Sequence, residues 1–156
     1  MELDRTDIKI LQLLQSNSRI SNQELAEAVS LSPSPCLRRV KQLEDAGIIG
    51  KYVALVNPKA VGLDLLAYVN VKLEKRVTQS GRFAFEDFGA AVQAWPEVVA
   101  CYSMTGDLDY LMRVQVKDLN HFSAFVMDKL LKHSGVLDVR SSFALERIKE
   151  TTALPI

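Results

Sequence analysis

Apolar residues recur every three or four positions along the first 46 residues, a spacing that predicts three short helices. The first helix is expected over Leu3–Ser16 with Asp4 as its N-cap. The second should begin after Ser21, where S-N-Q-E forms a capping box. The third is expected over Pro33–Ala46 and should end at Gly47. This spacing is typical of a small helical domain.

The third predicted helix is amphipathic and basic. Three apolar residues are expected to share its core side: Leu37, Val40 and Leu43. The opposite side and its flanks then carry Pro35, Arg38, Arg39, Lys41 and Gln42. A short helix, a tight turn and a second helix with an outward basic side indicate a helix-turn-helix that places its second helix in the major groove of DNA. The alternative is a pair of helices in an all-α core with a solvated basic side.

The helical pattern ends after Gly47, and a different pattern follows. β-prone residues around Tyr52–Val56 predict a short strand that could serve as a wing beside the three helices. Asn57-Pro58 breaks this strand, so we place a linker over Val56–Gly62. These boundaries give a first domain over residues 1–60, a winged helix-turn-helix with its linker strand, and a second domain over residues 61–156.

In the second domain the apolar residues alternate, which predicts four strands separated by two helices. The strands are expected over Ala67–Leu73, Val98–Thr105, Tyr110–Lys117 and Val136–Ile148, and the helices over Phe85–Trp95 and Asp118–Gly135. The order βαββαβ predicts a ferredoxin-like fold, in which two helices cover one face of an antiparallel sheet. The chain is therefore an α+β protein by expectation.

One face of such a sheet lacks a covering layer, and its surface suggests a partner. Large apolar residues that alternate along the strands include Tyr102, Met104 and Phe143, although the sequence leaves open which face each of them occupies. Pairing two sheets face to face would cover them, so a dimer through this domain is expected. Four aromatic residues are assigned to the core beneath the helices: Phe85, Phe88, Phe122 and Phe125.

Composition narrows the function. The 156 residues are 48% hydrophobic and 24% charged, and the formal net charge is zero, so affinity for DNA must come from local charges and from several copies of the site. The sequence has no N-terminal signal pattern and no apolar run of membrane length, so we expect a cytoplasmic protein. Its two cysteines, Cys36 and Cys101, are isolated, which fits a reducing compartment and packed thiols. Catalytic signatures and metal-ligand clusters are missing from the sequence. We therefore expect no catalytic residue, no metal and no cofactor.

Four sequence motifs together indicate a family. They are L-D-R-T-D-I-K-I-L at Leu3–Leu11, L-S-P-S-P-C-L-R-R-V-K-Q-L-E at Leu31–Glu44, G-I-I at Gly47–Ile49 and G-D-L-D-Y at Gly106–Tyr110. With these motifs the chain resembles the Lrp/AsnC (feast/famine) regulators. The resemblance implies a DNA-binding transcription regulator that forms homodimers, assembles further to octamers and responds to a small amino acid.

The resemblance also implies two sets of site residues. The residues expected at double-stranded DNA are Asn22, Gln23, Ser32, Ser34, Pro35, Arg38, Arg39 and Lys41. The effector is expected between dimers, near Tyr102, Met104, Thr105, Gly106, Asp107, Leu108, Asp109 and Tyr110 on one side and Arg140, Ser141 and Ser142 on the other. Many relatives carry threonine at the position of Val139, so this chain has one hydroxyl fewer there.

The chemistry of the second set suits an α-amino acid. Asp107 and Asp109 can bind its ammonium group, and Ser141 with the turn backbone around Gly106 can donate to its carboxylate. Leu108 and Met104 favour an apolar effector such as leucine or methionine. The alternative is that Gly106-Asp107 is only a hairpin turn. Two other functions stay open at this point: an enzyme or enzyme subunit on the same scaffold, and a ligand-sensing module whose helix-turn-helix no longer binds DNA.

Overall fold

The computed structural model describes residues 2–75, 77, 81 and 83–156, and they divide into two compact domains. The first domain comprises the residues up to Leu55 together with Ile148–Ile156, and the second comprises Val56–Arg147. The sequence placed the boundary at residue 60. The sequence pattern placed the last nine residues in the second domain, whereas in the structure they pack with the first.

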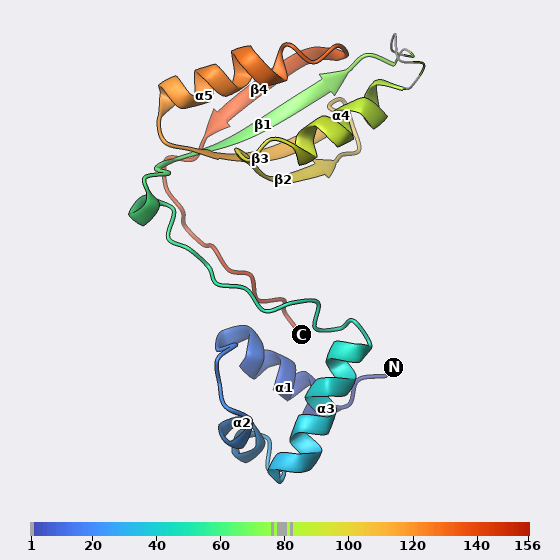
Figure 1. The fold of residues 1–156 in the computed structure, drawn as a ribbon, viewed down its shortest axis with the longest axis vertical. Coiled ribbons are helices and arrows are strands. Elements are labelled where there is room, and N and C mark those ends of the chain that lie inside the picture. Colours follow the sequence, from blue (N-terminus) through green and yellow to red (C-terminus); the bar gives the residue numbers. More distant parts are fainter. Residues whose placement is uncertain (1, 76, 78–80, 82) are drawn as a thin grey trace. The chain divides into compact units, whose positions relative to one another are not determined.

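The first domain contains three helices, α1 (Arg5–Ser16), α2 (Asn22–Ala28) and α3 (Pro33–Asp45), as the hydrophobic spacing predicted (Figure 1). Asp4 and Ser21 are the N-caps of α1 and α2, and each forms the predicted capping box. The buried core between the helices consists of Ile10, Leu11, Leu25, Ala26, Cys36 and Leu43.

Gly47 ends α3 as predicted, because its φ of 70° lies in the left-handed region that favours glycine. The amide of Ile48 donates to the carbonyl of Leu43 (2.9 Å) and the amide of Gly47 donates to the carbonyl of Glu44 (2.9 Å). This pair of hydrogen bonds is a Schellman motif, which satisfies carbonyls that the helix leaves unpaired.

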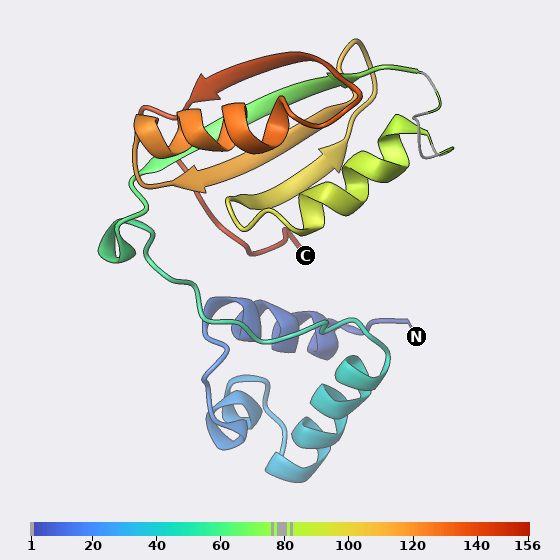
Figure 2. The same cartoon turned by 45° about the horizontal axis from the view of Figure 1, so that its top comes forward.

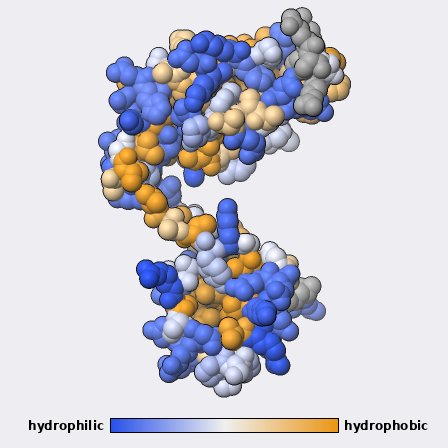
Figure 3. Space-filling model, viewed as in Figure 1, coloured by the Kyte–Doolittle hydropathy of each residue, from blue (hydrophilic) through white to orange (hydrophobic). Residues whose placement is uncertain are grey.

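The predicted wing strand at Tyr52–Val56 was wrong. Residues 51–57 are extended but belong to no sheet, and Leu55 is 73% exposed. A β-prone segment becomes a strand only beside another strand, and none of the described residues pairs with this one. Hydrophobic side chains gather along this segment in the space-filling view (Figure 3).

The second domain is a four-stranded antiparallel sheet in the order β2-β3-β1-β4, which confirms the ferredoxin-like prediction. Its elements after the short turn η1 (Lys59–Val61) are β1 (Leu65–Leu73), α4 (Ala84–Gln93), β2 (Val98–Ser103), β3 (Tyr110–Val116), α5 (Leu119–Phe125), the π-helical turn η2 (Val126–Leu130) and β4 (Val136–Phe143). Both views place α4 and α5 across the same face of the sheet (Figures 1 and 2). No helix among the described residues is long and apolar enough to cross a membrane.

The core of the second domain lies between this face and the helices. Alternate residues of the central strands are fully buried there: Ala67, Val69 and Val71 of β1, and Met112, Val114 and Val116 of β3. The prediction that Phe88, Phe122 and Phe125 are buried is confirmed, whereas Phe85 is 54% exposed and stacks on Phe83 (5.5 Å between ring centres). The buried side of α4 repeats every four residues at Ala84, Phe88 and Val92, and Phe85 falls beside it.

The predicted length of the last strand was also wrong. β4 ends at Phe143, and the final bond of the ladder runs from the amide of Ala144 to the carbonyl of Leu66 (3.0 Å). The neighbouring strand β1 begins at Leu65, so later residues have no strand beside them, and Leu145 is fully exposed. Apolar alternation beyond Phe143 therefore did not produce sheet.

The residues after this point, Ile148–Ile156, return to α1; we call them the C-terminal tail. The side-chain amide of Gln15 bonds the backbone of Leu154 twice, accepting from its N–H (2.6 Å) and donating to its carbonyl (3.2 Å). Gln12 donates to the carbonyl of Ile156 (2.5 Å). The tail thus binds α1, the helix that precedes the predicted helix-turn-helix.

Candidate DNA interface and effector site

The buried side of α3 differs from the predicted one. Cys36, Val40 and Leu43 face the core, whereas Leu37, which was expected there, is 57% exposed. Two of the three predicted core residues are therefore right, and exchanging Leu37 for Cys36 turns the centre of the core side by only about 30° at 100° per residue. The outward side of α3 therefore carries Ser34, Leu37, Arg38, Lys41 and Gln42.

The start of α3 is fixed by contacts with α2 and the turn between the helices. The side chain of Asn22 donates to the carbonyl of Pro33 (2.9 Å), so this predicted DNA residue ties α2 to the first turn of α3. Ser30 takes a left-handed φ of 57° in the turn. Ser32 is the N-cap of α3, as predicted, but its hydroxyl makes no capping hydrogen bond. This hydroxyl and the amide of Ser34 are groups that a phosphate oxygen can accept from, whereas Pro33 and Pro35 of the same turn have no amide hydrogen.

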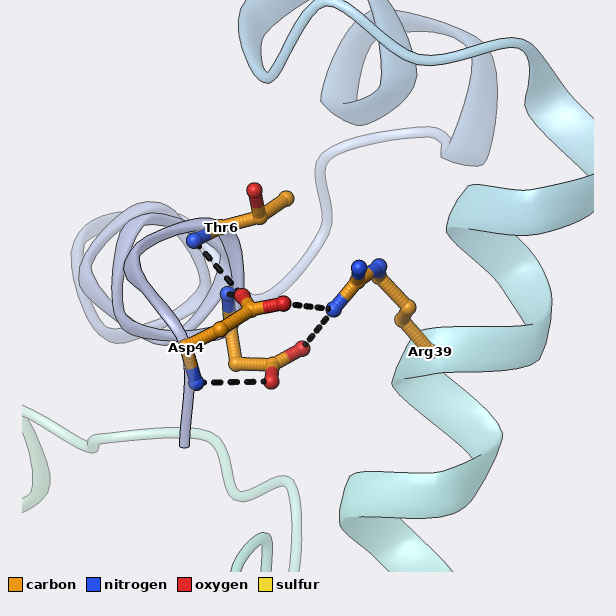
Figure 4. A network of polar contacts seen from close by, with 4 residues as sticks. Asp4, Thr6 and Arg39 are labelled. Carbon is orange, nitrogen blue, oxygen red and sulfur yellow. Dashed lines mark hydrogen bonds and ion pairs between the residues drawn. The ribbon is translucent and has the colours of Figure 1, made fainter. Parts of the chain in front are cut away.

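Arg39 joins α3 to the start of α1 through two carboxylates (Figure 4). Its Nη1 donates to Asp4 Oδ2 (2.7 Å) and to Asp7 Oδ1 (2.8 Å), and Asp7 is only 3% exposed. Hydrogen bonds from the Asp7 backbone amide and from Arg39 hold the pKa of Asp4 below its ordinary value, and the two carboxylates raise the pKa of Arg39. The guanidinium is thus engaged within the domain.

The remaining two cations of α3 are placed differently. Arg38 and Lys41 are exposed, and neither has an ion-pair partner among the described residues. Gln23 of α2 is exposed, and its side-chain Nε2 donates to Glu27 Oε1 (3.4 Å). Pro35 is half-buried on the same flank as Arg39. The structure therefore brings Ser32, Ser34, Arg38 and Lys41 of the predicted set together on one open side of α3.

The β2–β3 hairpin holds the first group of predicted effector residues. The turn opens at Gly106 (φ 110°) and is closed by the amide of Met104, which donates to the carbonyl of Asp109 (2.8 Å). Asp109 accepts from the amide of Leu73 (2.7 Å) through its carboxylate, so this side chain anchors the hairpin to β1. Asp107 at the tip is exposed and is the carboxylate that stays open to a ligand.

Beside the hairpin lies a pocket of about 360 Å³ between the end of β1 and the start of α4. Its apolar lining comes from Leu73, Phe83, Phe85, Met104 and Tyr110. Burial raises the pKa of the Tyr110 hydroxyl, and the ring of Tyr110 packs on Phe88 at 4.9 Å. Phe83 was not predicted from the sequence, and Phe85 was expected in the core. The F-A-F pattern before a helix was the available signal.

The second group of predicted effector residues lies on β4, the opposite edge of the sheet from β2. Arg140 and Ser142 pair with Asn70 and Tyr68 on the open face, whereas Ser141 pairs with buried Val69 on the helix face. The Arg140 Nε donates to Asp138 (3.1 Å).

Strand spacing shows how far apart the two groups are. Asp109 lies level with Lys72 of β1, and Ser141 and Ser142 lie level with Val69 and Tyr68. Two strand spacings and three to four residues along the strand separate their backbones by roughly 14 to 16 Å. Within one chain, therefore, the structure does not bring these serines together with the hairpin.

Comparisons with known proteins decide the family. A family model described as winged helix-turn-helix DNA-binding matches residues 3–49, and the model of the Lrp/AsnC ligand binding domain matches residues 66–154. The chain belongs to the Lrp/AsnC family. The Lrp/AsnC fold and both domains expected from the sequence are thus present, and the chain is a DNA-binding transcription regulator.

Individual relatives of this Lrp/AsnC regulator are themselves described as transcription regulators. It is 44% identical to the DNA-binding transcriptional activator DecR of Escherichia coli over 99% of both chains, and 41% identical to the leucine-responsive regulatory protein of Haemophilus influenzae, covering 97% of this chain and 89% of that one. A transcriptional regulator from Neisseria meningitidis, solved as a complex with L-methionine, is 55% identical with a TM-score of 0.93, covering 99% and 97% of the two chains. These relatives are regulators, so the enzyme alternative is set aside.

Proposed function

We propose that this regulator responds to a small apolar amino acid, L-methionine in the first place and L-leucine in the second, bound between two copies of the chain. The observation that carries the proposal is the separation of the two predicted halves of the effector site. The hairpin and the serines of β4 lie on opposite edges of one sheet, roughly 14 to 16 Å apart. One free amino acid does not extend that far, so a ligand that touches both groups needs the hairpin of one copy and the β4 edge of another.

The exposed groups on each side suit the parts of an amino acid. Asp107 offers a carboxylate to the ammonium group, and the Ser141 hydroxyl with the backbone around Gly106 offers donors to the ligand carboxylate. Met104 and Val139 are apolar neighbours for an unbranched or branched aliphatic side chain. The complex of the Neisseria meningitidis relative with L-methionine supports methionine as the first candidate.

Assembly would follow from the open face of the sheet. This face carries exposed Tyr68, Val99 and Tyr102 between polar side chains, and pairing two such faces buries them in a dimer. Phe143, which the sequence left on either face, contacts Phe122 of α5 at 5.0 Å and so belongs to the helix side. Further assembly of dimers to an octamer brings a hairpin to a neighbouring β4. The effector then shifts assembly because it binds one arrangement more tightly than another.

The test measures unfolding of the full chain with L-methionine, L-leucine, D-methionine and glycine. At a ligand concentration of one hundred times Kd, a binding amino acid raises the free energy of unfolding by about 2.7 kcal/mol. Asp107→Asn should abolish the shift, and the matched control Asp64→Asn, an exposed carboxylate beside the start of β1, should retain it. Light scattering after size exclusion follows the mass with and without ligand. A ligand that binds a monomer would refute the two-copy site, and one that binds a dimer as tightly as the larger assembly would refute its placement between dimers.

A further inference from the structure

Leu37 is an apolar residue on the outward side of α3. It is 57% exposed, whereas the core of its domain is formed by Cys36, Leu43 and their neighbours. Along the helix surface it lies between Ser34 and Lys41, three residues before and four residues after it, which are its nearest neighbours on that side. A single exposed leucine is ordinary in a protein surface. This one lies within the outward side of α3, the second helix of the helix-turn-helix, which is the helix that such a motif places in the major groove.

The major groove offers few apolar groups. Each base pair presents donors and acceptors there, and the 5-methyl group of thymine is the apolar feature on a base edge. A leucine has no donor or acceptor, so it gains only by covering a methyl group and loses when it desolvates the polar edge of another base. Residues 32–42 contain no acidic side chain, so the surface around Leu37 is complementary to DNA rather than to a basic partner.

We propose that Leu37 is a specificity-determining residue that contacts the methyl group of a thymine in each half-site of the operator. The inference rests on DNA binding through α3, and it adds a base preference that the polar residues do not supply. Arg38 and Lys41 set affinity through phosphates or guanine, and Leu37 selects thymine. Burial of one methyl group against a leucine corresponds to a three- to five-fold change in affinity.

Deoxyuridine lacks only the 5-methyl group of thymine and therefore isolates this contact. The preferred site is first selected from random duplexes with the full wild-type chain, and each thymine is then replaced in turn by deoxyuridine while binding is followed by fluorescence anisotropy. We expect one thymine per half-site at which the replacement weakens wild-type binding three- to five-fold. Leu37→Ala should bind the thymine and deoxyuridine duplexes equally. Leu131→Ala, a truncation of an exposed leucine in the second domain, should keep the wild-type difference.

The outcomes separate this inference from DNA binding itself. Arg38→Ala should weaken binding to both duplexes and retain the methyl preference, because its own contact is not with the methyl group. If wild type selects no duplex, the premise that α3 binds DNA is refuted. If wild type selects a site but shows no methyl effect, or if Leu37→Ala keeps that effect, the role of Leu37 is refuted. A loss of oligomer mass in Leu37→Ala would assign the residue to contact with another copy. Circular dichroism of Leu37→Ala and of the milder Leu37→Met checks that α3 is intact.

Discussion

The two adjacent arginines of α3 should have opposite roles, and two substitutions separate them. Arg39 donates to Asp4 and to Asp7 within its own domain, whereas Arg38 is exposed on the outward side. We expect Arg39→Ala to destabilise the first domain and Arg38→Ala to weaken DNA binding without changing stability.

The magnitude for Arg39 follows from the burial of its two partners. The Asp4 carboxylate is 53% exposed, so water replaces this contact at little cost. The Asp7 carboxylate is 4% exposed and would lose its charged donor, Arg39, although it keeps the amide of Asp4 (3.1 Å). A hydrogen bond to a charged group contributes about 1.5 to 3 kcal/mol. For a domain of this size the lower bound alone corresponds to a fall in Tm of at least roughly 6 °C.

Thermal unfolding and DNA binding are measured on both variants. Arg38→Ala should unfold like wild type and lower the slope of log Kd against log salt by about one unit, because one phosphate contact is lost. A double-mutant cycle of Asp7→Asn with Arg39→Met should give a coupling energy above about 1 kcal/mol. The reasoning fails if Arg39→Ala keeps the wild-type Tm and loses as much affinity for DNA as Arg38→Ala.

Three further predictions follow from single contacts. Phe88 is fully buried against Trp95, Tyr110 and His133, and Phe88→Ala should lower the free energy of unfolding of the second domain by about 3 to 5 kcal/mol, measured by denaturant titration, without changing α3. The pKa of Asp4 is lowered in the folded protein, so its contribution to stability is complete above its unfolded pKa of 3.8 and is lost as the pH falls through the folded value. Asp4→Asn should therefore make the free energy of unfolding of the first domain depend less on pH below about pH 3.8. Gln15→Ala should speed hydrogen exchange at the amide of Leu154 and change Tm little, because the contact is exposed.

The sequence predicted the order of elements in both domains because each element carries its own signals. Asp4 and Ser21 cap helices through bonds within four residues, and Gly47 ends α3 through its own φ. The alternation of β1 and β3 has a period that only a half-buried strand produces. Such local signals need no knowledge of distant residues.

The missed features all depend on partners distant in the sequence. Arg39 lies on a buried flank because Asp7, 32 positions earlier, is there to pair with it, and no helical wheel of α3 contains that information. Leu37 and Cys36 were both expected toward the core, and packing against residues of α1 and α2 buries only Cys36. The segment after Phe143 alternates like a strand, but β1 begins too late to pair with it. The distribution of the predicted effector residues over both sheet edges follows from strand order, which a list of motifs does not show.

The position of the C-terminal tail affects how the protein is made. Residues Leu154 and Ile156 bond α1 across 139 and 144 positions of sequence, so the ribosome finishes the whole second domain before these contacts can form. At 5 to 20 residues per second the matching surface of α1 stays uncovered for roughly 7 to 28 s. During this interval the helices and core of the first domain are complete, but the side chains of Gln12 and Gln15 lack their hydrogen bonds to the C-terminal tail. The first domain therefore gains its last contacts only after the second domain has been synthesised.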